Sequence, residues 1–371
     1  MPLTFAVNDK GILPDRMIAA LTADGAVLPA YPLAPDQIQP ASLDLRLADI
    51  AFRVRASFLP GRHATVAERI DDLKLHEIAL GDGAVLETGC VYIVPLIESL
   101  ALPPGLAAAA NPKSSTGRLD VFTRVIADRA RGFDQVEHGY HGPLYAEISP
   151  RTFPILVREG SRLSQIRFRR GEALLDAQTL AELNARERLV DSADADVGAG
   201  ITVSVDLSGE RGMVGYRAKR HTGVVDIERR AGYEIGEFWE SIPPRNDRNL
   251  ILDPNEFYIL ASKEAVQVPP DYAAEMVPFD PLVGEFRVHY AGFFDPGFGY
   301  SGAGGRGSRA VLEVRSREVP FILEHGQIVG RLIYEKMLER PSSLYGERIG
   351  SNYQAQGLKL SKHFRSEFGR V

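Results

Sequence analysis

The stretch of sequence that decides the fold occurs twice in the chain. LETGCVYIVPLIESLALPPGLAAAANP, residues 86–112, is matched by LDPNEFYILASKEAVQVPPDYAAEMVP, residues 252–278, and the residue numbers differ by a constant 166 (252 − 86 and 278 − 112). Downstream, Glu147 in LYAEISP corresponds to Glu313 in AVLEVRS at the same offset. A repeat of this length predicts two copies of one structural module, because each copy carries its own set of strands and turns.

Both copies consist of short segments with strand-like alternation. YAEIS, FPILV and AVLEV carry β-branched or aromatic residues at alternate positions, and Gly or Pro interrupts such segments roughly every 8 to 12 positions. This spacing is typical of antiparallel sandwiches and barrels. We therefore expect an all-β fold in two tandem modules, with short helices at residues 14–22 and 180–190.

The repeat also predicts the domain organisation. We expect copy one over residues 1–172, a charged, Ala-rich linker over 173–199, copy two over 200–340 and a C-terminal arm over 341–371. Near the start of each copy, SLDLRL at 42–47 resembles SVDLSG at 204–209, and we align these two segments with each other.

Composition excludes several classes of protein. With 371 residues, 44% of them apolar and 25% charged, the chain is typical of a globular protein, and no apolar run suggests a membrane span. The net charge of −6 does not favour nonspecific nucleic-acid binding. Cys90 is the only cysteine, so no intrachain disulfide can form, and we expect a cytoplasmic protein without a cysteine-based zinc site.

The loop NPKSSTGR is a candidate phosphate-binding site. It offers two hydroxyls, turn amides and two cations, from Lys113, Ser114, Ser115 and Arg118. Neutral and charged donors in one short loop suit a phosphate chain. The alternative is an ordinary polar turn without a ligand.

Glu147 and Glu313 are each the lone acid of an apolar strand. Apolar neighbours disfavour an ionised carboxyl, which suits a group that both accepts and donates protons near neutral pH. The alternative is that strand alternation turns both side chains toward solvent.

Two glycine-rich stretches follow in copy two. In HYAGFFDPGFGY, residues 289–300, a turn at Asp295 is flanked by aromatic residues that could hold a base and a sugar hydroxyl, or could simply be core packing around a hairpin. GAGGRG, residues 302–307, matches a dinucleotide-binding fingerprint, but the strand-like SRAVLEVRS follows it, so we reject that interpretation.

The last candidate is the tail, residues 342–364. Its Gly, Ser, Gln and Lys content predicts either a disordered terminus or an arm that orders over a ligand. The contact residues of such an arm would be Tyr353, Gln356, Lys359 and Lys362.

Taken together, these motifs resemble the dCTP deaminases, a family within the trimeric dUTPase superfamily. The resemblance rests on PASLDLRL, LPPGLAAAANPKSSTGR, the D-P-G-F turn before a strand bearing L-E, and G-x-x-x-x-Q at 160–165, in that order. The chain is about twice the length of the single-module enzymes, so it is similar to the double-length form of the family.

The resemblance implies hydrolytic deamination of dCTP to dUTP and ammonia, in the synthesis of pyrimidine deoxynucleotides, on dUTPase-like distorted β-barrels. A glutamate would act as general base on water without a catalytic metal, Ser115 and Arg118 would orient the water and stabilise charge, and Mg²⁺ would arrive with the triphosphate. A single cysteine also fails to supply the ligand set of the zinc-dependent base deaminases. A homo-oligomer, with a trimer favoured, is implied as well.

The two copies depart from the family in complementary ways. Copy one keeps the serine loop but has Glu137 and His138 in the turn and Phe133 four residues before it; copy two lacks the loop but keeps Asp295, with Ala291 four residues before it. Family sites lie between subunits, so the resemblance favours a composite site, whose residues would be Ser114, Ser115, Arg118, Ala291, Asp295 and Glu313. The alternative is a site within copy one that uses Glu147.

Other functions stay open at this point. A dUTP pyrophosphatase, or an enzyme that deaminates dCTP and then cleaves the product to dUMP, would use the same nucleotides. A regulator that binds nucleotides without turnover is the alternative from another class.

Overall fold

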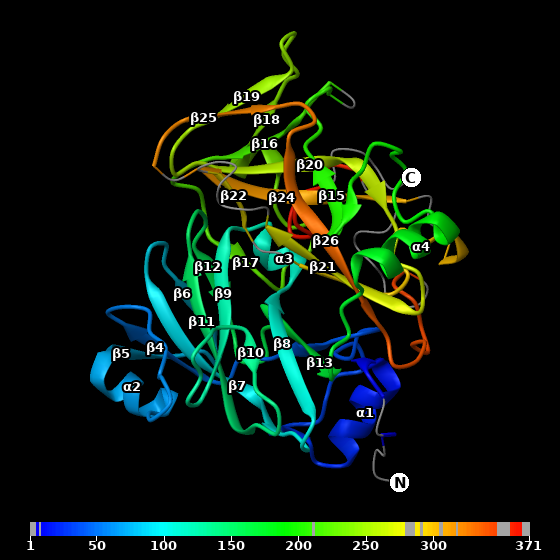
Figure 1. Ribbon diagram of the computed structural model, residues 1–371. Helices are drawn as coiled ribbons and strands as arrows, with labels where there is room; N and C mark the ends of the chain where they lie inside the picture. The colour runs from blue at the N-terminus through cyan, green and yellow to red at the C-terminus, as the bar shows by residue number, and fades with distance from the viewer. Residues whose placement is uncertain are drawn as a thin grey trace. The chain divides into compact units, whose positions relative to one another are not determined.

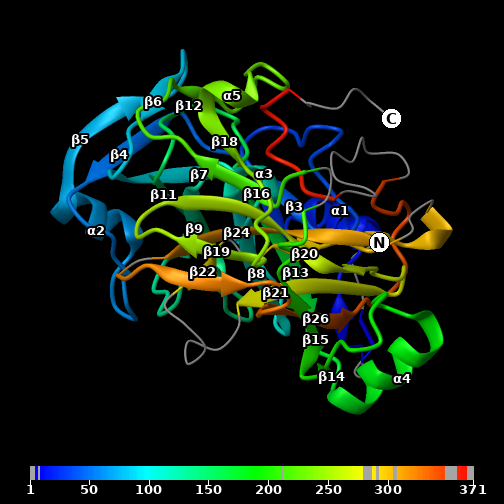
Figure 2. The same cartoon turned by 90° about the horizontal axis from the view of Figure 1, so that it is seen from above.

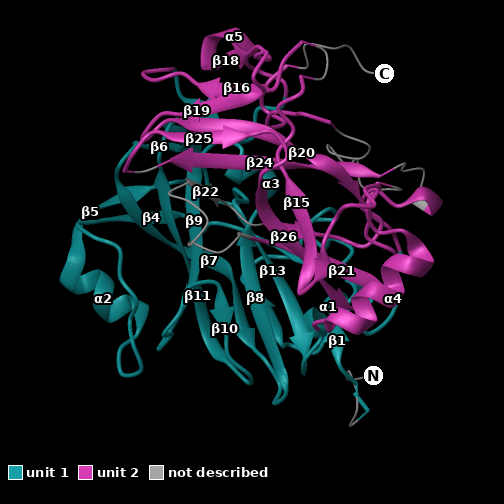
Figure 3. Cartoon of the chain, turned by 45° about the horizontal axis from the view of Figure 1, so that its top comes forward, with its two compact units in different colours: residues 1–173, 223–230, 337–342 teal, residues 174–222, 231–336, 343–371 magenta. Residues whose placement is uncertain are grey.

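The computed structural model describes residues 5–6, 9–209, 212–278, 286–289, 292–303, 307–316, 318–346 and 357–365. The chain forms two compact units (Figure 3). Unit 1 contains residues 1–173, 223–230 and 337–342, and unit 2 contains residues 174–222, 231–336 and 343–371. Both consist mainly of β-strands with a few short helices, which confirms the predicted fold class.

Unit 1 folds into three small sheets (Figures 1 and 2). The first has the order β1-β13-β8-β10 with β3 beside β13, the second has the order β5-β4-β7-β11-β9 with β2 beside β7, and the third is β17-β12-β6. Its elements are β1 (Gly11–Ile12), α1 (Asp15–Ala23), β2 (Val27–Pro29), β3 (Leu43–Leu45), β4 (Ile50–Val54), α2 (Val66–Leu73), β5 (Lys74–Ala79), β6 (Ala84–Leu86), β7 (Val91–Ala101), β8 (Leu106–Pro112), α3 (Ser114–Gly117), β9 (Val121–Ala127), β10 (Gln135–Val136), β11 (His141–Pro150), β12 (Ile155–Val157), β13 (Ser164–Arg170) and β17 (Val225–Asp226).

Unit 2 repeats this strand order. Its sheets are β14-β15-β26-β21-β23, β18-β16-β20-β24-β22 and β19-β25. Its elements are α4 (Ala177–Glu187), β14 (Val197–Gly198), β15 (Gly200–Ser204), β16 (Gly215–Ala218), α5 (Ile235–Phe238), β18 (Trp239–Ile242), β19 (Asn249–Leu252), β20 (Phe257–Val266), β21 (Tyr272–Pro278), β22 (Phe286–His289), β23 (Phe293–Phe294), the 3-10 turn η2 (Ser301–Ala303), β24 (Ser308–Ser316), β25 (Phe321–Glu324) and β26 (Ile328–Lys336). The strand β24 follows the glycine-rich residues 302–307, which agrees with the expectation that this stretch is not a dinucleotide-binding fingerprint.

The pairing register of the strands repeats as well. Glu147 lies opposite Ile93 in unit 1, and Glu313 lies opposite Ile259 in unit 2, so both members of the pair keep the offset of the repeat (313 − 147 = 259 − 93). The Tyr92 hydroxyl accepts a hydrogen bond from the Glu87 amide at 3.0 Å, and Tyr258 and Asp253 repeat this contact at the same distance. The common register supports the prediction of an internal duplication.

One alignment within the repeat is wrong by four positions. The amide of Leu47 bonds the Ser161 carbonyl, and the amide of Val205 bonds the Gln327 carbonyl. The counterpart of SLDLRL at 42–47 is therefore GITVSV at 200–205, and not SVDLSG at 204–209. A shift of four positions preserves the two-residue alternation of a strand, so the sequence pattern alone does not detect it.

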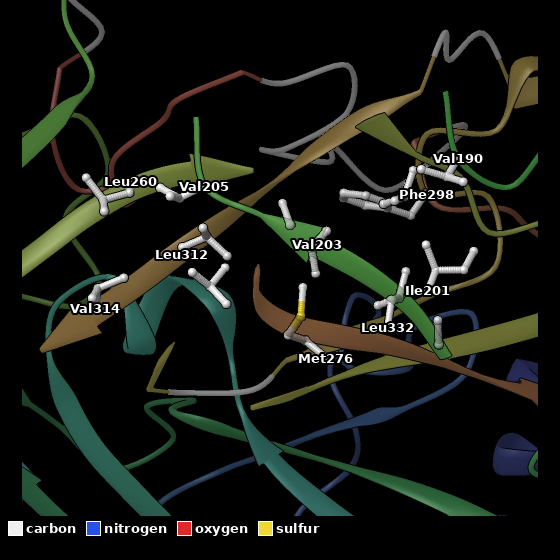
Figure 4. Packing of buried hydrophobic residues seen from close by; sticks show 14 of the residues in the cluster. Val190, Ile201, Val203, Val205, Leu260, Met276, Phe298, Leu312, Val314 and Leu332 are labelled. Carbon is white, nitrogen blue, oxygen red and sulfur yellow. The ribbon is translucent and has the colours of Figure 1, made fainter. Parts of the chain in front are cut away.

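The core of unit 2 shows how the alternation becomes packing. Val203 on β15, Met276 on β21, Leu312 on β24 and Leu332 on β26 point toward one another from two sheets (Figure 4). All four are buried. Burying side chains of this size contributes about 1.5 to 3 kcal/mol each, which holds the strands that carry the candidate site residues in one register.

Two predicted helices are present, with shifted ends. Helix α1 begins at Asp15 and buries Ile18 and Leu21. Helix α4 begins three positions before the predicted 180–190, because the Asp176 side chain caps it by accepting a hydrogen bond from the Thr179 amide at 2.8 Å. Residues 173–199, predicted as a linker, thus contain α4 and β14 and contribute apolar residues to the core of unit 2.

Unit 1 also includes two segments from beyond residue 200. Strand β17 pairs in parallel with β12, and Arg158 holds Asp226 through two hydrogen bonds of 2.8 and 2.9 Å. Residues 337–342 contact the start of the chain, where the Leu338 amide bonds the Ile12 carbonyl at 2.9 Å. Copy two is therefore not one continuous unit over 200–340.

Candidate active site

The serine loop of unit 1 forms a single helical turn after β8. Lys113 caps this turn, α3, and its amide bonds the Leu163 carbonyl at 2.9 Å. The Thr116 hydroxyl donates to the same carbonyl, also at 2.9 Å. Ser115 and Arg118 are buried and Ser114 is half-buried. The loop is thus fixed at two points to the residue just before β13, which is more order than an exposed polar turn would have.

Glu147 of β11 is buried and paired with an arginine. Its carboxylate accepts hydrogen bonds from Arg124 of β9 at 3.2 Å (Nε) and 2.6 Å (Nη2), both to Oε1. The Arg124 guanidinium lies 3.3 Å from the ring centre of Phe133 and 4.5 Å from that of Phe122, and it also bonds the Ser57 hydroxyl at 3.0 Å. Glu147 is therefore paired with a cation that itself stacks on aromatic rings, rather than surrounded by apolar side chains alone.

Glu313 occupies the same register position on β24. It is 6% exposed, against 1% for Glu147, so the alternative that strand alternation turns these side chains to solvent is wrong for both. The residue opposite Glu313 on β22 is His289, where unit 1 has Arg124 opposite Glu147. The two glutamates thus share a register but not the residue that faces them across the strand pair.

The turn at Asp295 is packed tightly. Asp295 is buried, and the carbonyl of the next residue, Pro296, accepts a hydrogen bond from the Tyr345 amide at 2.8 Å. Gly297 has a φ of +99°, and a Cβ there would lie 2.8 Å from both the Leu344 Cβ and the Tyr345 amide nitrogen. Only glycine fits this position without displacing the chain. The glycine of the D-P-G sequence is therefore required for this turn, which carries Asp295.

The aromatic residues of this turn belong to the core. Phe298 lies edge-on to Phe294 with ring centres 4.9 Å apart, and it also contacts Tyr345 at 5.9 Å. Phe298 is buried in the apolar cluster of unit 2. The interpretation of these rings as core packing around a hairpin is thus correct for Phe298.

The corresponding turn of unit 1 is more open. Glu137 is exposed, and Arg131 lies 3.8 Å from its carboxylate. Burial raises the pKa of Tyr140, three positions on, to about 12, so its hydroxyl stays protonated and donates to the Pro143 carbonyl at 2.7 Å. Glu137 is thus not a buried carboxylate of the kind that Asp295 supplies in unit 2.

The described part of the tail is packed against unit 2. Phe364 contacts the rings of Tyr233, Phe238 and Trp239, with ring centres 5.4 to 6.4 Å apart. The Ala231 amide bonds the Lys362 carbonyl at 2.9 Å. Residues 357–365 are thus anchored, in contrast to a disordered terminus.

The predicted site residues fall into three groups. Unit 1 brings together the loop residues Lys113, Ser114, Ser115 and Arg118, and it holds Glu147 on a neighbouring sheet. Unit 2 holds Asp295 and Glu313, with Lys359 exposed and Lys362 half-buried. Ala291, Tyr353 and Gln356 lie outside the described residues. The composite site joins residues of both units and stays a prediction.

The sequence analysis missed a second repeated glutamate pair. Glu98 of β7 and Glu264 of β20 are also related by the offset of the repeat (264 − 98 = 313 − 147), and both are buried. Glu98 accepts from the amide of Arg46 at 2.8 Å, and Glu264 accepts from the amide of Ser204 at 2.7 Å. Their carboxylates thus bond backbone amides of another segment of their unit, so a repeated buried glutamate is not in itself a sign of catalysis.

Within the described ranges, the structure adds no further candidate site of two other kinds. No three His, Cys, Asp or Glu side chains there are grouped so that they could hold a metal ion. No described helix is long and apolar enough to cross a membrane.

Comparisons with known proteins identify two matching family models. The model described as the 2'-deoxycytidine 5'-triphosphate deaminase (DCD) N-terminal domain matches residues 9–172, and the C-terminal domain model matches residues 176–364. The crystal structure of 2'-deoxycytidine 5'-triphosphate deaminase from Agrobacterium tumefaciens is 61% identical, covers 90% of this chain and all of that chain, and superposes with a TM-score of 0.86.

Shorter relatives match a part of the chain. A dCTP deaminase of Halorubrum lacusprofundi is 30% identical over 161 residues, which are 42% of this chain and 76% of the relative. A protein of Nocardia farcinica named "dCTP deaminase, dUMP-forming" is 36% identical over 159 residues, 42% of this chain and 74% of the relative. Such relatives are thus about half as long as this chain.

Proposed function

The chain belongs to the dCTP deaminase family, and we propose that it hydrolyses dCTP to dUTP and ammonia at a composite site. In this proposal, the serine loop of unit 1 holds the nucleotide and the glutamate strand of unit 2 carries the general base, Glu313. The overall reaction consumes one water and releases one ammonia for each dCTP.

The observation that carries the choice of base is the ion pair of Glu147. Arg124 binds this carboxylate and stacks against Phe133. Both hydrogen bonds from Arg124 go to Oε1 of Glu147, so this oxygen is already occupied and is not available to accept a proton from water, which argues against Glu147 as the base. In addition, the turn carboxylate that accompanies the catalytic strand in this family is kept and buried in unit 2, as Asp295. Both facts favour Glu313.

The proposed mechanism needs one proton shuttle. Glu313 removes a proton from water, and the water oxygen attacks the ring carbon that bears the amino group. The same carboxyl delivers this proton to the ring nitrogen. It then takes the second proton from the added hydroxyl and passes it to the leaving amine, so that the carbonyl forms, the carbon–nitrogen bond breaks and ammonia departs. Ser115 orients the water and Arg118 stabilises the charge that develops in the transition state. We expect Mg²⁺ to accompany the triphosphate as part of the substrate.

A second candidate activity is the cleavage of dUTP to dUMP and pyrophosphate after deamination. Relatives named "dUMP-forming" at 32 to 36% identity favour this possibility. Asp295 is the carboxylate in unit 2 that could activate water for attack on phosphorus.

Product analysis tests these functions. Purified protein is incubated with dCTP and Mg²⁺, and the products are separated by ion-exchange chromatography. We expect dUTP and ammonia in equal amounts; dUMP and pyrophosphate would show the bifunctional activity. Binding of dCTP without turnover would instead indicate a regulator and overturn the proposal.

The same assay tests the role of metals. We expect activity to survive a zinc-selective chelator and to weaken when Mg²⁺ is removed, because the cation screens the triphosphate. Loss of activity on zinc chelation, with recovery on added zinc, would contradict a metal-free catalytic step.

The assembly is part of the proposal. Because sites of this family lie between subunits, we expect a homo-oligomer, with a trimer favoured. Light scattering on the eluting protein measures this directly, and a monomer at assay concentrations with full activity would contradict it.

A further inference from the structure

Asp44 of β3 is a buried carboxylate beside the serine loop. Its residue is 2% exposed, and its strand pairs with β13, which in turn pairs with β8. Across these three strands, Asp44 lies opposite Gln165, and Gln165 lies opposite Asn111, two positions before Lys113. The sheet therefore brings Asp44 to the point where the loop leaves β8.

Two cations meet this carboxylate. Lys113 forms an ion pair with the Asp44 Oδ2, and the Arg162 Nη1 lies 3.6 Å from the same oxygen. Arg162 also bonds Asp36 at 3.0 Å. The Asp44 Oδ1 is buried and has no hydrogen-bond partner among the described residues. A carboxylate this deeply buried is stable only while its cations stay close.

The Lys113 side chain is placed so that it can serve two partners. It is 22% exposed, whereas the Asp44 side chain is 2% exposed, so the ammonium lies between the buried carboxylate and the surface. An ammonium has three N–H donors. One N–H donor can hold Asp44 while the others bind a phosphate oxygen. The Lys113 side chain then does not have to change its conformation when a nucleotide binds.

Unit 2 has other residues at both positions of this pair. The residue that corresponds to Asp44 is Thr202, because Asp44 lies opposite Gln165 and Thr202 lies opposite Arg331, the counterpart of Gln165 in the repeat (331 − 165 = 313 − 147). The sequence position that corresponds to Lys113, directly after the strand-ending proline, holds Phe279. The charged pair therefore belongs to the unit that keeps the serine loop.

We propose that Asp44 is a positioning residue for the phosphate chain: it fixes the Lys113 ammonium so that lysine and serine loop bind the phosphates together. This inference rests on the proposed function, since it assumes that a deoxynucleoside triphosphate binds at the serine loop. Arg162 keeps the buried carboxylate partly neutralised when phosphate competes for Lys113.

A double-mutant cycle tests this coupling. Binding of α,β-imido-dUTP with Mg²⁺ is measured by calorimetry for wild type, Asp44→Asn, Lys113→Gln and the double variant. We expect each single change to weaken binding about tenfold, and the double variant to be no weaker than the worse single variant, because both remove the same interaction. Turnover of dCTP should show the same change in KM, with kcat within about threefold of wild type.

A different pattern of affinities is expected if Asp44 does not position Lys113. If Lys113 binds phosphate independently of Asp44, Asp44→Asn removes a competing negative charge, and binding becomes tighter or stays unchanged while Lys113→Gln weakens it. That pattern would overturn the proposal. Calorimetry reports on Asp44 whether or not dCTP is deaminated, so a failure of the proposed activity is seen separately, in the product assay.

Two controls separate positioning from folding. Asp36→Asn also removes a carboxylate that pairs with Arg162. The Asp36 side chain is 63% exposed, and its ion pair is with Arg162 rather than with Lys113. Nucleotide affinity should therefore stay within about twofold of wild type. Deoxycytidine, which has no phosphate, should bind Asp44→Asn and wild type equally. An equal loss of affinity for deoxycytidine and for the triphosphate analogue would indicate a general structural role and contradict positioning.

Discussion

Strands β11 and β24 occupy the same place in their units but present their glutamates to different surroundings. Glu147 and Glu313 share one register, and both are buried. Glu147 is held by Arg124, which stacks on Phe133, whereas the residue opposite Glu313 is His289. The comparison shows that a repeated fold preserves where a residue lies, while its neighbours decide its chemistry. The shared register therefore does not by itself decide which of the two glutamates takes part in the proposed reaction.

The largest expected effect outside the glutamates concerns the serine loop, which the sequence retains in unit 1. Arg118→Ala should lower kcat by at least about tenfold, because the guanidinium stabilises charge in the transition state, and Ser115→Ala should do the same through loss of water orientation. Steady-state kinetics with a thermal-melt check measure both. The exposed Arg131→Ala is the matched control and should retain wild-type kinetics. A wild-type kcat in Arg118→Ala would show that the active site does not include this loop.

The next effect concerns the ion pair that distinguishes Glu147. Arg124→Met should lower the free energy of unfolding by about 1 to 3 kcal/mol, since it leaves a buried carboxylate without its cation; the value is reduced because the arginine is partly exposed. The double variant with Glu147→Gln should recover part of this loss. Urea unfolding measures the stability, and kcat should stay near wild type. A large fall in kcat with unchanged stability would show that Glu147 takes part in catalysis.

The smallest effect concerns a charged cluster of unit 2. Burial tends to raise the pKa of Asp206, but hydrogen bonds from Ser208 and the nearby Arg309 outweigh it and hold that pKa below its usual value. The folded pKa is thus below the unfolded one, so Asp206 contributes stability above the unfolded pKa and loses it as the pH falls through the folded pKa. Unit 1 has Ala48 at the corresponding position, directly after Leu47.

This acid dependence can be measured with one variant. As the pH falls below the unfolded pKa of about 3.9, wild type should lose more unfolding free energy than Asp206→Asn, which has no titrating group at this position. Urea titrations at several pH values give both curves. Parallel curves would show that Asp206 does not contribute to the acid sensitivity.

Much of the fold follows from sequence because the repeat provides an internal comparison. The constant offset between the copies predicts the common register of β7 and β20 and of β11 and β24, and the structure has that register. Before β15, insertions change the offset between the two copies. The two-residue alternation of a strand cannot distinguish the correct alignment from one shifted by four positions, so the predicted alignment of SLDLRL is wrong. Helix α2 was not predicted, although Thr65 and Glu68 form a capping box.

The sequence shows the residues of the candidate site as motifs but does not show their contacts. The loop and both glutamates are visible as motifs, and the resemblance to the family gives them roles. The Arg124–Glu147 pair and the Asp44–Lys113 pair join residues 23 and 69 positions apart, so no local pattern reveals them. Glu98 and Glu264, a pair that the sequence analysis missed, also keep the offset of the repeat, but their hydrogen bonds to backbone amides indicate a structural role.

The most direct test of the account compares Glu313→Gln with Glu147→Gln in single-turnover deamination of dCTP. The amide keeps the shape of the carboxyl but cannot shuttle a proton, so we expect Glu313→Gln to bind dCTP and produce no dUTP, while Glu147→Gln keeps a rate near wild type. Thermal melts verify that both variants are folded. An inactive Glu147→Gln together with an active Glu313→Gln would contradict the composite site and place the reaction within unit 1.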